Sequence, residues 1–393
     1  MGTRSVAAVL AAAALLGAAC SGPGKAERLN AGSRRPAPTT APTAAQPPAA
    51  PATTPARSAG VTQPCPVPDG GRLKGVEAIR ARPSGVWVEL EGAGAGAPVL
   101  VGSGDGGATW TSHCLAGIGA TEALFFVDDA HGWAAVTGST AGRVLLTADG
   151  GATWRAARLP DPATFVHDVY FLDARRGFAA GDTGGAPAVL RSTDGGRTWT
   201  ALSPTALPLA STVRFVDTLH GWVADADRQI AATADGGATW TVARLIGAED
   251  EFLRDLAFAD RLHGWAVTAT DDARAGTLWA TVDGGRTWAP THRFPHGVSA
   301  VTVLDAGHLL VAGGLPVVVE YSGDGGTAWS RTTLPAAFTD VGVLDRSVLW
   351  AYSTTADRAG CLYRTGDGGR TWSGHAVFGS KACPGVTPGP AAG

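Results

Sequence analysis

The stretch Ser103-Gly-Asp105-Gly-Gly-Ala-Thr-Trp110 is the first of seven similar segments in the chain, and their repetition predicts the fold. Successive copies lie 41 to 48 residues apart, and all share the pattern S/T-x-D-G-G-x-x-W. The other six copies begin at Thr147, Ser192, Thr233, Thr281, Ser322 and Thr365. A period of this length in a chain of short apolar runs is typical of propeller blades, each of which is one small sheet. The sequence therefore predicts an all-β fold, a seven-bladed β-propeller with four antiparallel strands per blade.

A second pattern precedes the D-G-G signature and marks the first turn of blades two to seven, whereas blade one is the most divergent, with Ala81-Arg-Pro83-Ser-Gly85-Val-Trp87 in its place. The form F-x-D-x-x-x-G followed by Trp or Phe stands at residues 126–133, 171–178, 215–222 and 258–265, and weaker forms start at Val303 and Val343. An Asp followed four residues later by a Gly, between alternating apolar runs, predicts a hairpin turn. Each blade is then expected to place the D-G-G signature between its third and fourth strands.

The signature aspartates have a structural explanation. An Asp side chain accepts hydrogen bonds from backbone N–H groups a few residues further on, and the two glycines adopt positive φ without a Cβ penalty. The D-x-D-x-D-G pattern of calcium loops is absent from the sequence. We therefore expect structural roles for Asp105, Asp149, Asp194, Asp235, Asp283, Asp324 and Asp367.

No metal site is expected from the histidines. His131, His220 and His263 recur at one turn position in three blades. Equivalent positions of different blades radiate outward and cannot converge on one ion, so we interpret them as solvated turn residues. No cofactor motif occurs in the sequence, and a net charge of -3 argues against a nucleic-acid partner.

The ends of the chain indicate export. Arg4, an apolar run from Val6 to Leu16 and the small residues before Cys20 form an export signal over residues 1–20 that is too short to span a membrane. It resembles a bacterial lipoprotein signal, in which Cys20 would be acylated, although that pattern prefers leucine three residues before the cysteine and Leu16 is four before. A secreted protein with unmodified Cys20 is the alternative. Residues 21–60, rich in Pro, Ala and Thr, are expected to be a disordered tether, and residues 384–393 a disordered tail.

The other cysteines form an even set, which suits disulfides in an oxidising compartment. They are Cys65, Cys114, Cys361 and Cys383, all within the propeller domain expected over residues 61–383. We favour pairing Cys65 with Cys114 and Cys361 with Cys383, because each pair then falls within one terminal blade. A bond between Cys65 and Cys383 that closes the ring is the rival.

The two faces of the ring differ in sequence. The first and third turns share one face, here called the turn face, and they repeat from blade to blade. The second turns and the blade-to-blade connections share the other face, here called the loop face, and they vary, so this face was free to specialise. The most distinctive connection is Arg244-Leu-Ile-Gly-Ala-Glu249-Asp250-Glu251-Phe-Leu-Arg254.

The inner strands suggest a ligand site at the channel mouth. Aligned on the turn aspartate, they carry polar residues five and three positions before it, on the less apolar side of the strand. The candidate ligand face consists of Asp168, Asp255 and Asp340 from blades three, five and seven, together with Arg80, Arg214, Arg254 and Tyr170. A water-filled channel lined by ordinary polar residues is the alternative.

The repeats also carry a family resemblance. The D-G-G signature resembles the Asp-box (BNR-like) repeat of sialidases, sortilin-type receptors and xyloglucan-active endoglucanases. In combination with F-x-D-x-x-x-G-W it is most similar to the photosystem II stability and assembly factor family of seven-bladed propellers, over about residues 74–378. The resemblance implies that the boxes lie on the periphery, away from any ligand site. It also implies a helper in membrane-protein assembly, without implying photosynthesis.

The sequence favours a binding protein over an enzyme. A sialidase uses three arginines, a tyrosine with a glutamate and an aspartate, but its entry motif has only loose echoes in Arg80-Ala-Arg-Pro83 and Arg293-Phe-Pro295, and that family has six blades. An endoglucanase builds its cleft from aromatic-rich loops, whereas the loops here are Gly, Ala and Pro and the chain has only four tyrosines.

We therefore expect a monomeric lipoprotein propeller, anchored to the outer side of the cytoplasmic membrane through Cys20. It would act as a non-catalytic scaffold for an envelope protein or glycan. The alternative is a secreted Asp-box glycoside hydrolase, sialidase-like or endoglucanase-like, with its site at the channel mouth.

Overall fold

The computed structural model describes residues 63–64, 76–82, 85–90, 99–114, 121–137, 142–161, 164–202, 205–247, 249–314, 318–333, 338–345, 347–353, 361–368, 370–376 and 383. All of them belong to one compact unit, Ala56–Gly393. The expected signal, tether and tail, with Cys20 and Cys65, lie outside the described residues. Within the described ranges there is no helix, and hence none that is long and apolar enough to cross a membrane.

Seven antiparallel sheets form the unit, and in six of them the order of strands in the sheet is the order in the chain. Blade one contains β1 (Gln63–Pro64), β2 (Val76–Arg82), β3 (Gly85–Leu90), β4 (Val99–Ser103) and β5 (Thr111–Cys114). Blade two contains β6 (Thr121–Phe126), β7 (Gly132–Thr137), β8 (Gly142–Thr147) and β9 (Arg155–Ala156). Blade three contains β10 (Thr164–Phe171), β11 (Gly177–Thr183), β12 (Ala186–Ser192) and β13 (Thr200–Ala201).

The remaining four blades follow the same scheme. Blade four contains β14 (Thr212–Phe215), β15 (Gly221–Ala224), β16 (Gln229–Thr233) and β17 (Thr241–Arg244). Blade five contains β18 (Glu251–Phe258), β19 (Gly264–Thr270), β20 (Gly276–Thr281) and β21 (Ala289–Phe294). Blade six contains β22 (Ala300–Val303), β23 (Leu309–Gly313), β24 (Val318–Ser322) and β25 (Ser330–Thr333). Blade seven contains β26 (Phe338–Val343), β27 (Leu349–Ser353), β28 (Cys361–Thr365) and β29 (Ser373–Ala376).

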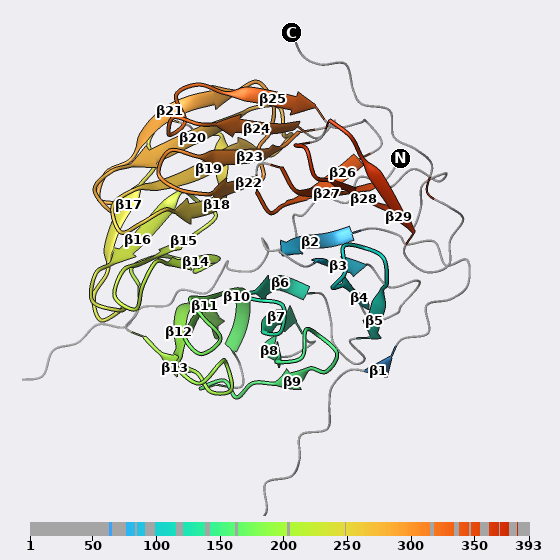
Figure 1. The fold of residues 1–393 in the computed structure, drawn as a ribbon. Helices are drawn as coiled ribbons and strands as arrows, with labels where there is room; N and C mark the ends of the chain where they lie inside the picture. Colours follow the sequence, from blue (N-terminus) through green and yellow to red (C-terminus); the bar gives the residue numbers. More distant parts are fainter. Residues whose placement is uncertain are drawn as a thin grey trace, which may run out of the picture. The chain divides into compact units, whose positions relative to one another are not determined.

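The sheets surround a common centre, with the first of the four main strands of each blade innermost (Figure 1). β2 contacts both β6 of blade two and β26 of blade seven, so packing between the first and last blades closes the ring. All four main strands of each blade come from one continuous segment, as the repeats indicate. The predicted seven-bladed β-propeller with four antiparallel strands per blade is confirmed.

Blade one has a fifth strand that the repeats do not predict. β1 pairs with β5, placing Gln63 opposite Cys114 and Pro64 opposite His113. Proline lacks an N–H and is tolerated on such an edge strand. This fifth strand is formed by residues that precede the first repeat, and it lies at the outer edge of the sheet, next to β5.

The F-x-D-x-x-x-G-W pattern joins neighbouring blades. The rings of Trp222 in blade four and Phe258 in blade five stack with their centroids 3.4 Å apart. The Trp222 indole Nε1 also donates a hydrogen bond to the carbonyl of Gly284, in the D-G-G turn of blade five, at 2.8 Å. Trp133 stacks on Phe171 and donates to Gly195 in the same manner between blades two and three. The aromatic residues of the pattern therefore hold one blade against the next.

The glycine of the same pattern makes room for the phenylalanine. A Cβ on Gly264 would lie 2.2 Å from Cε1 of Phe258, and glycines at the equivalent position in blades two to four face their own phenylalanine in the same way. In blades six and seven, where valine replaces the phenylalanine, leucine replaces the glycine, as Leu309 and Leu349 show. The large and small residues exchange places, so this glycine is required by packing.

Candidate functional site

Each D-G-G signature folds into a turn in which the hydroxyl of its first residue and the aspartate act together. In blade one, Asp105 Oδ1 accepts hydrogen bonds from the backbone N–H of Thr109 at 2.9 Å and from the Ser103 hydroxyl at 2.8 Å. Asp105 Oδ2 accepts from the Thr109 hydroxyl at 2.6 Å. The Ser103 oxygen accepts in turn from the N–H of Gly107, which has a φ of 94°. The carboxylate is thus occupied in the turn itself.

These hydrogen bonds lower the pKa of the signature carboxylates. Hydrogen bonds from Thr239 and Thr233 lower the pKa of Asp235 to about 2. Blade six departs from the pattern because Thr327 and Ala328 are exchanged in order. There Asp324 accepts from the backbone N–H of Ala328 at 2.9 and 3.1 Å, from the N–H of Thr327 and from the Ser322 hydroxyl, but the threonine hydroxyl that donates to the aspartate carboxylate in the other boxes bonds the backbone carbonyl instead.

The first turns lie beside the D-G-G turns of the same blade. The N–H of Gly284 donates to the carbonyl of Leu262 at 3.0 Å, and Gly236 donates to Leu219 at 2.9 Å. Three turn aspartates bind the histidines that the sequence singled out, and a fourth pair, Asp305 with His308, has the same geometry at 2.8 Å. Each histidine contacts its own turn aspartate, and no group of three or more metal-ligating side chains occurs among the described residues.

Asp168 and Asp255 each follow a β-bulge in their inner strand. In β10 the register with β11 shifts between Val166 and Asp168, and in β18 the register with β19 shifts between Leu253 and Asp255. A bulge reverses the alternation of side chains along a strand. As a result Val166 and Val169, three residues apart, are both buried. The inner strands of blades one, two and seven have the same irregularity.

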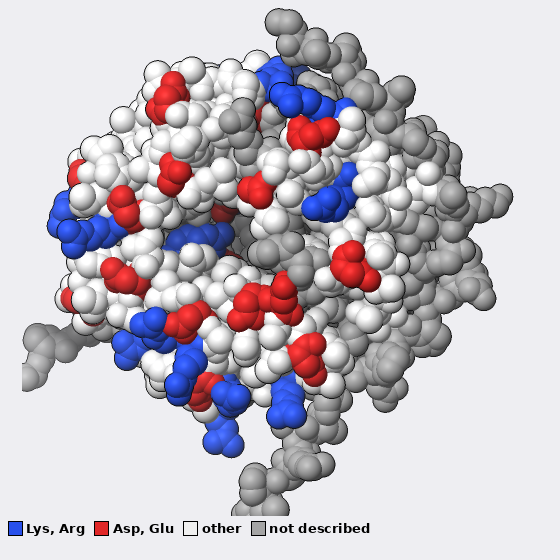
Figure 2. Space-filling model, viewed as in Figure 1, with Lys and Arg blue, Asp and Glu red and all other residues white. Residues whose placement is uncertain are grey.

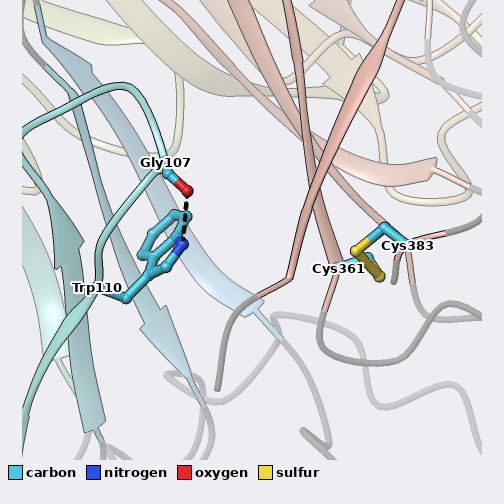
Figure 3. The surroundings of a disulfide bond; sticks show 4 residues. All are labelled: Gly107, Trp110, Cys361 and Cys383. Carbon is cyan, nitrogen blue, oxygen red and sulfur yellow. Dashed lines mark hydrogen bonds between the residues drawn. A yellow bond between two sulfur atoms is a disulfide. The ribbon is translucent and has the colours of Figure 1, made fainter. Parts of the chain in front are cut away.

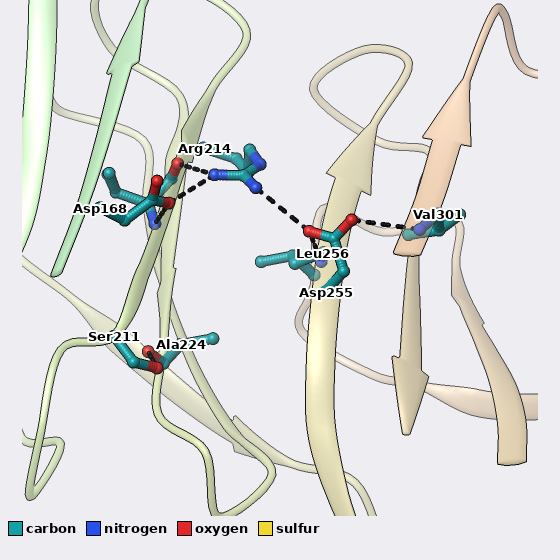
Figure 4. A network of polar contacts seen from close by, with 8 residues as sticks. Asp168, Ser211, Arg214, Ala224, Asp255, Leu256 and Val301 are labelled. Atoms are coloured by element: carbon teal, nitrogen blue, oxygen red, sulfur yellow. Dashed lines mark hydrogen bonds and ion pairs between the residues drawn. The ribbon is translucent and has the colours of Figure 1, made fainter. Parts of the chain in front are cut away.

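Arg214 connects two of the predicted aspartates across three blades (Figure 4). Its Nη1 donates to Asp168 Oδ2 at 2.6 Å, and its Nη2 donates to Asp255 Oδ1 at 3.1 Å. The three side chains are 17–24% exposed. The Arg214 guanidinium also lies 5.7 Å from the ring centre of Tyr170. We call these four residues the inner-strand network.

Both aspartates of the network also bind the backbone of the next blade. Asp168 Oδ2 accepts from the N–H of Val213 in blade four at 3.0 Å, and Asp255 Oδ2 accepts from the N–H of Val301 in blade six at 3.1 Å. Asp255 Oδ1 accepts as well from the N–H of Leu256 at 2.8 Å. The aspartates thus hold the inner strand of one blade to that of the next. No sequence pattern indicates this role, because it depends on backbone groups that every residue carries.

The environment of Arg214 favours its charged form. Burial by itself would lower the pKa of Arg214, but the charges of Asp168 and Asp255 outweigh burial and raise it. Burial also raises the pKa of Tyr170, opposed by the charge of Arg214. At neutral pH the network is therefore a guanidinium between two aspartates, beside a neutral phenol.

The other candidate residues are placed differently. Arg254 is the bulge residue of β18, and its Nη2 donates to the Asp271 carboxylate at 3.2 Å and to the carbonyl of Thr270 at 3.3 Å, so it binds the end of β19 and not Asp255. Arg80 lies in β2 opposite Trp87, and Asp340 lies in β26 opposite Tyr352. The side chains of Arg80 and Asp340 lie outside the described residues.

The space-filling view places charge at the centre of one face. Figure 2 shows a hollow in the middle of the ring, with Lys or Arg and Asp or Glu atoms inside it, and further acidic side chains spread around it.

In blade five the buried Glu251 accepts from the hydroxyls of Thr268 and Thr277, at 2.5 and 3.0 Å. In blade six Glu320 accepts from Arg331 Nε at 2.8 Å and lies 3.1 Å from His296 Nε2. Sequence reasoning missed both clusters, because each joins residues from different strands.

A disulfide links Cys361, the first residue of β28, to Cys383, with the Cα atoms 5.8 Å apart (Figure 3). A Cβ on Gly374 of β29 would lie 2.6 Å from the Cys383 Cβ, so glycine leaves room for the bridge. This bond leaves Cys383 unavailable to Cys65. Cys114 ends β5, opposite Gln63 of β1, and its bond to Cys65 stays a prediction because Cys65 lies outside the described residues.

Comparison with known proteins gives the same resemblance as the repeats. Residues 246–381 match the family model of the photosynthesis system II assembly factor YCF48. A curated relative, the photosystem II assembly lipoprotein Ycf48 of Synechococcus sp. (strain CC9902), is 28% identical over 168 residues, covering 42% of this chain and 48% of the relative. The chain thus spans about half the length of the curated relative that it matches.

Two solved structures are also similar. YCF48 from Cyanidioschyzon merolae is 21% identical, covers 67% of this chain and 87% of its own, and has a TM-score of 0.50. A structure described as YCF48 bound to D1 peptide is 22% identical, covers 64% of this chain and 80% of its own, and has a TM-score of 0.48. At this identity the structural likeness concerns the fold alone. The expected resemblance is confirmed: this chain is a seven-bladed propeller similar to the photosystem II assembly factors, and its residues 246–381 carry the family match.

Proposed function

We propose that this protein is an exported, lipid-tethered scaffold that binds a protein partner during assembly of a membrane protein, without catalysing a reaction. The match over residues 246–381 and the name of the curated relative, an assembly lipoprotein, support this role. The lipid would be carried by Cys20, after removal of the export signal. An envelope glycan is the alternative ligand class.

The inner-strand network is the observation that carries the proposal. Asp255 uses both carboxylate oxygens for hydrogen bonds within the protein, to Leu256 and Arg214 through one and to Val301 through the other. A glycosidase of the usual kind needs one carboxyl group to protonate the leaving group and a second to act on the sugar or on water. Here Asp168 and Asp255 contact the same guanidinium and hold neighbouring blades, which suits a rigid binding surface.

The same network offers a partner two kinds of anchor. Arginine and tyrosine are enriched among the residues that dominate binding energy at protein interfaces. Arg214 is held in place by Asp168 and Asp255, so little side-chain entropy remains to be lost on binding. We place the binding site where the loop face meets the channel, beside the variable connections.

A crosslinking experiment tests the scaffold. A photo-crosslinking amino acid at Phe252, at the start of β18, is expected to capture a membrane protein in intact cells, and the same group at Thr241 on the outer strand β17 serves as control. Arg214→Lys keeps the charge but cannot span both aspartates, and we expect it to lower the Phe252 yield severalfold. Equal yields with and without Arg214→Lys would contradict the assigned site.

Two further measurements address the tether and the alternative function. Cys20→Ala is expected to move the protein from the membrane fraction to the soluble fraction, because the variant lacks the cysteine that would carry the lipid. The purified protein is expected not to hydrolyse fluorogenic sialosides or β-glucan oligosaccharides. Turnover that disappears in an Asp168→Asn, Asp255→Asn, Asp340→Asn variant would establish the glycoside hydrolase instead.

A further inference from the structure

Exposed apolar side chains recur in the first and third turns of blades four to six. The described residues include six exposed large hydrophobic side chains, and four of them lie in these turns: Leu219, Leu262, Val282 and Leu304. Val282, in the D-G-G signature of blade five, is 72% exposed. Grouped apolar side chains on a soluble surface often mark a binding site. We call these four residues the turn-face patch.

Hydrogen bonds between turns and blades keep the patch together. Within blade five, the N–H of Gly284 donates to the carbonyl of Leu262, which brings the first turn beside the signature that contains Val282. Between blades four and five, Trp222, three residues after Leu219, donates to the carbonyl of Gly284. Trp265 makes the corresponding bond to Gly325 of blade six, at 3.3 Å. The patch therefore crosses three rigidly connected blades.

The turns that carry the patch are acidic, and a basic group from another blade, the Arg191 guanidinium, lies 3.9 Å from the Cβ position of Gly236. The first turns and signatures of blades four to six contain the aspartates Asp217, Asp235, Asp260, Asp283, Asp305 and Asp324 and only two basic side chains, those of Arg261 and Arg286, besides histidine. Partial burial opposes ionisation at Asp217, Asp260 and Asp283, but hydrogen bonds outweigh it, and the pKa of all six aspartates is lowered. The six carboxylates stay ionised at neutral pH.

We propose that the turn-face patch docks a segment of a partner protein that combines apolar with lysine or arginine side chains. The apolar side chains would cover Leu219, Leu262, Val282 and Leu304, and the basic ones would face the surrounding aspartates. The same acidic surroundings disfavour an anionic membrane or a second copy of this surface, both of which are negative. This goes beyond the proposed function, because it adds a second surface on the face opposite the loops.

Binding of designed peptides to the full mature protein tests this inference. The probe is a short fluorescent peptide of alternating leucine and lysine, compared with peptides in which glutamate replaces lysine or serine replaces leucine. We expect the leucine–lysine peptide to bind at least about tenfold more tightly than either comparison peptide, and binding to weaken as salt is raised. Hydrogen exchange is expected to show protection in the turns of blades four to six.

Matched variants locate the binding. Leu262→Ser with Val282→Ser is expected to weaken the peptide about tenfold. Ile246→Ser is the control: it removes a side chain that is 74% exposed, in the connection between β17 and β18 on the other face, and should change nothing. Undiminished binding to the double variant, equal binding of the glutamate peptide or protection on the loop face would overturn the proposal.

Other occupants give distinct results. Dimerisation of the wild type that the double variant abolishes, measured by sedimentation, would assign the patch to a second copy and overturn the proposal. Binding to phosphatidylglycerol vesicles that is lost in the double variant would assign the patch to a membrane surface and would also overturn the proposal. Arg214→Lys, which tests the loop-face site, should leave peptide binding intact, so either proposal can fail without the other.

Discussion

Exchanging the large and small residues of one blade should show that the F-x-D-x-x-x-G pattern is a packing device. In blade five, Gly264→Leu places a side chain where a Cβ alone would be 2.2 Å from Phe258, and such overpacking typically costs about 1–3 kcal/mol. Phe258→Val removes the ring that stacks on Trp222 at 3.4 Å, which we expect to cost about 2 kcal/mol from lost burial and stacking. If the two changes were independent, the double variant would lose about 4 kcal/mol.

Blade six shows why the changes should not add. There Leu309, fully buried, and Val303 belong to one apolar cluster with Trp265 of the preceding blade. The double variant gives blade five the same pair, so we expect it to lose only about 1 kcal/mol, a coupling of about 3 kcal/mol. Guanidinium unfolding followed by tryptophan fluorescence would measure this for the wild type, both single variants and the double variant. A double variant that loses as much stability as the two single variants together would show that the two positions do not pack against each other.

Three other predictions concern turns and the disulfide. Cys361→Ser with Cys383→Ser should lower the free energy of unfolding by about 3 kcal/mol, the chain-entropy value for a separation of 22 residues. Reduction of the wild type should lower its unfolding midpoint by at least as much, because it would also break a bond between Cys65 and Cys114; an unchanged midpoint in the double variant would contradict the prediction. Ala328→Thr should raise the free energy of unfolding by about 0.5–1 kcal/mol, because it returns to Asp324 the hydroxyl donor that the other boxes have; an unchanged unfolding midpoint would contradict this. The pKa of Asp235 is lowered from 3.8 to about 2, so this residue should stabilise the fold above pH 3.8 and lose that contribution as the pH falls towards 2. In an acid titration, the free energy of unfolding of Asp235→Asn should therefore fall less steeply over this pH range than that of the wild type.

Local patterns in the sequence were sufficient for much of the fold. The spacing of seven D-G-G signatures predicted the number of blades, and the position of each signature predicted the third turn, because turn chemistry depends on residues that are adjacent in the chain. The same local logic placed Asp168, Tyr170 and Arg214 on one side of their strands. Arg254, six positions before the turn aspartate of blade five, was not part of that alternation, and it binds Thr270 and Asp271 at the end of β19.

What the tertiary structure alone decided are the contacts between blades. The glycine of F-x-D-x-x-x-G looked like a turn residue in the sequence, yet its absence of a side chain serves the phenylalanine ring beside it. The sequence suggested that Asp168 and Asp255 line a ligand site at the channel mouth. In the structure each also accepts a hydrogen bond from a backbone N–H in the next blade, about 45 residues further along the chain. The architecture of each blade could be predicted from its own repeat, because strand alternation and turns are local properties. The closing of the ring brought together groups from different repeats, and no single repeat contains the information for those contacts.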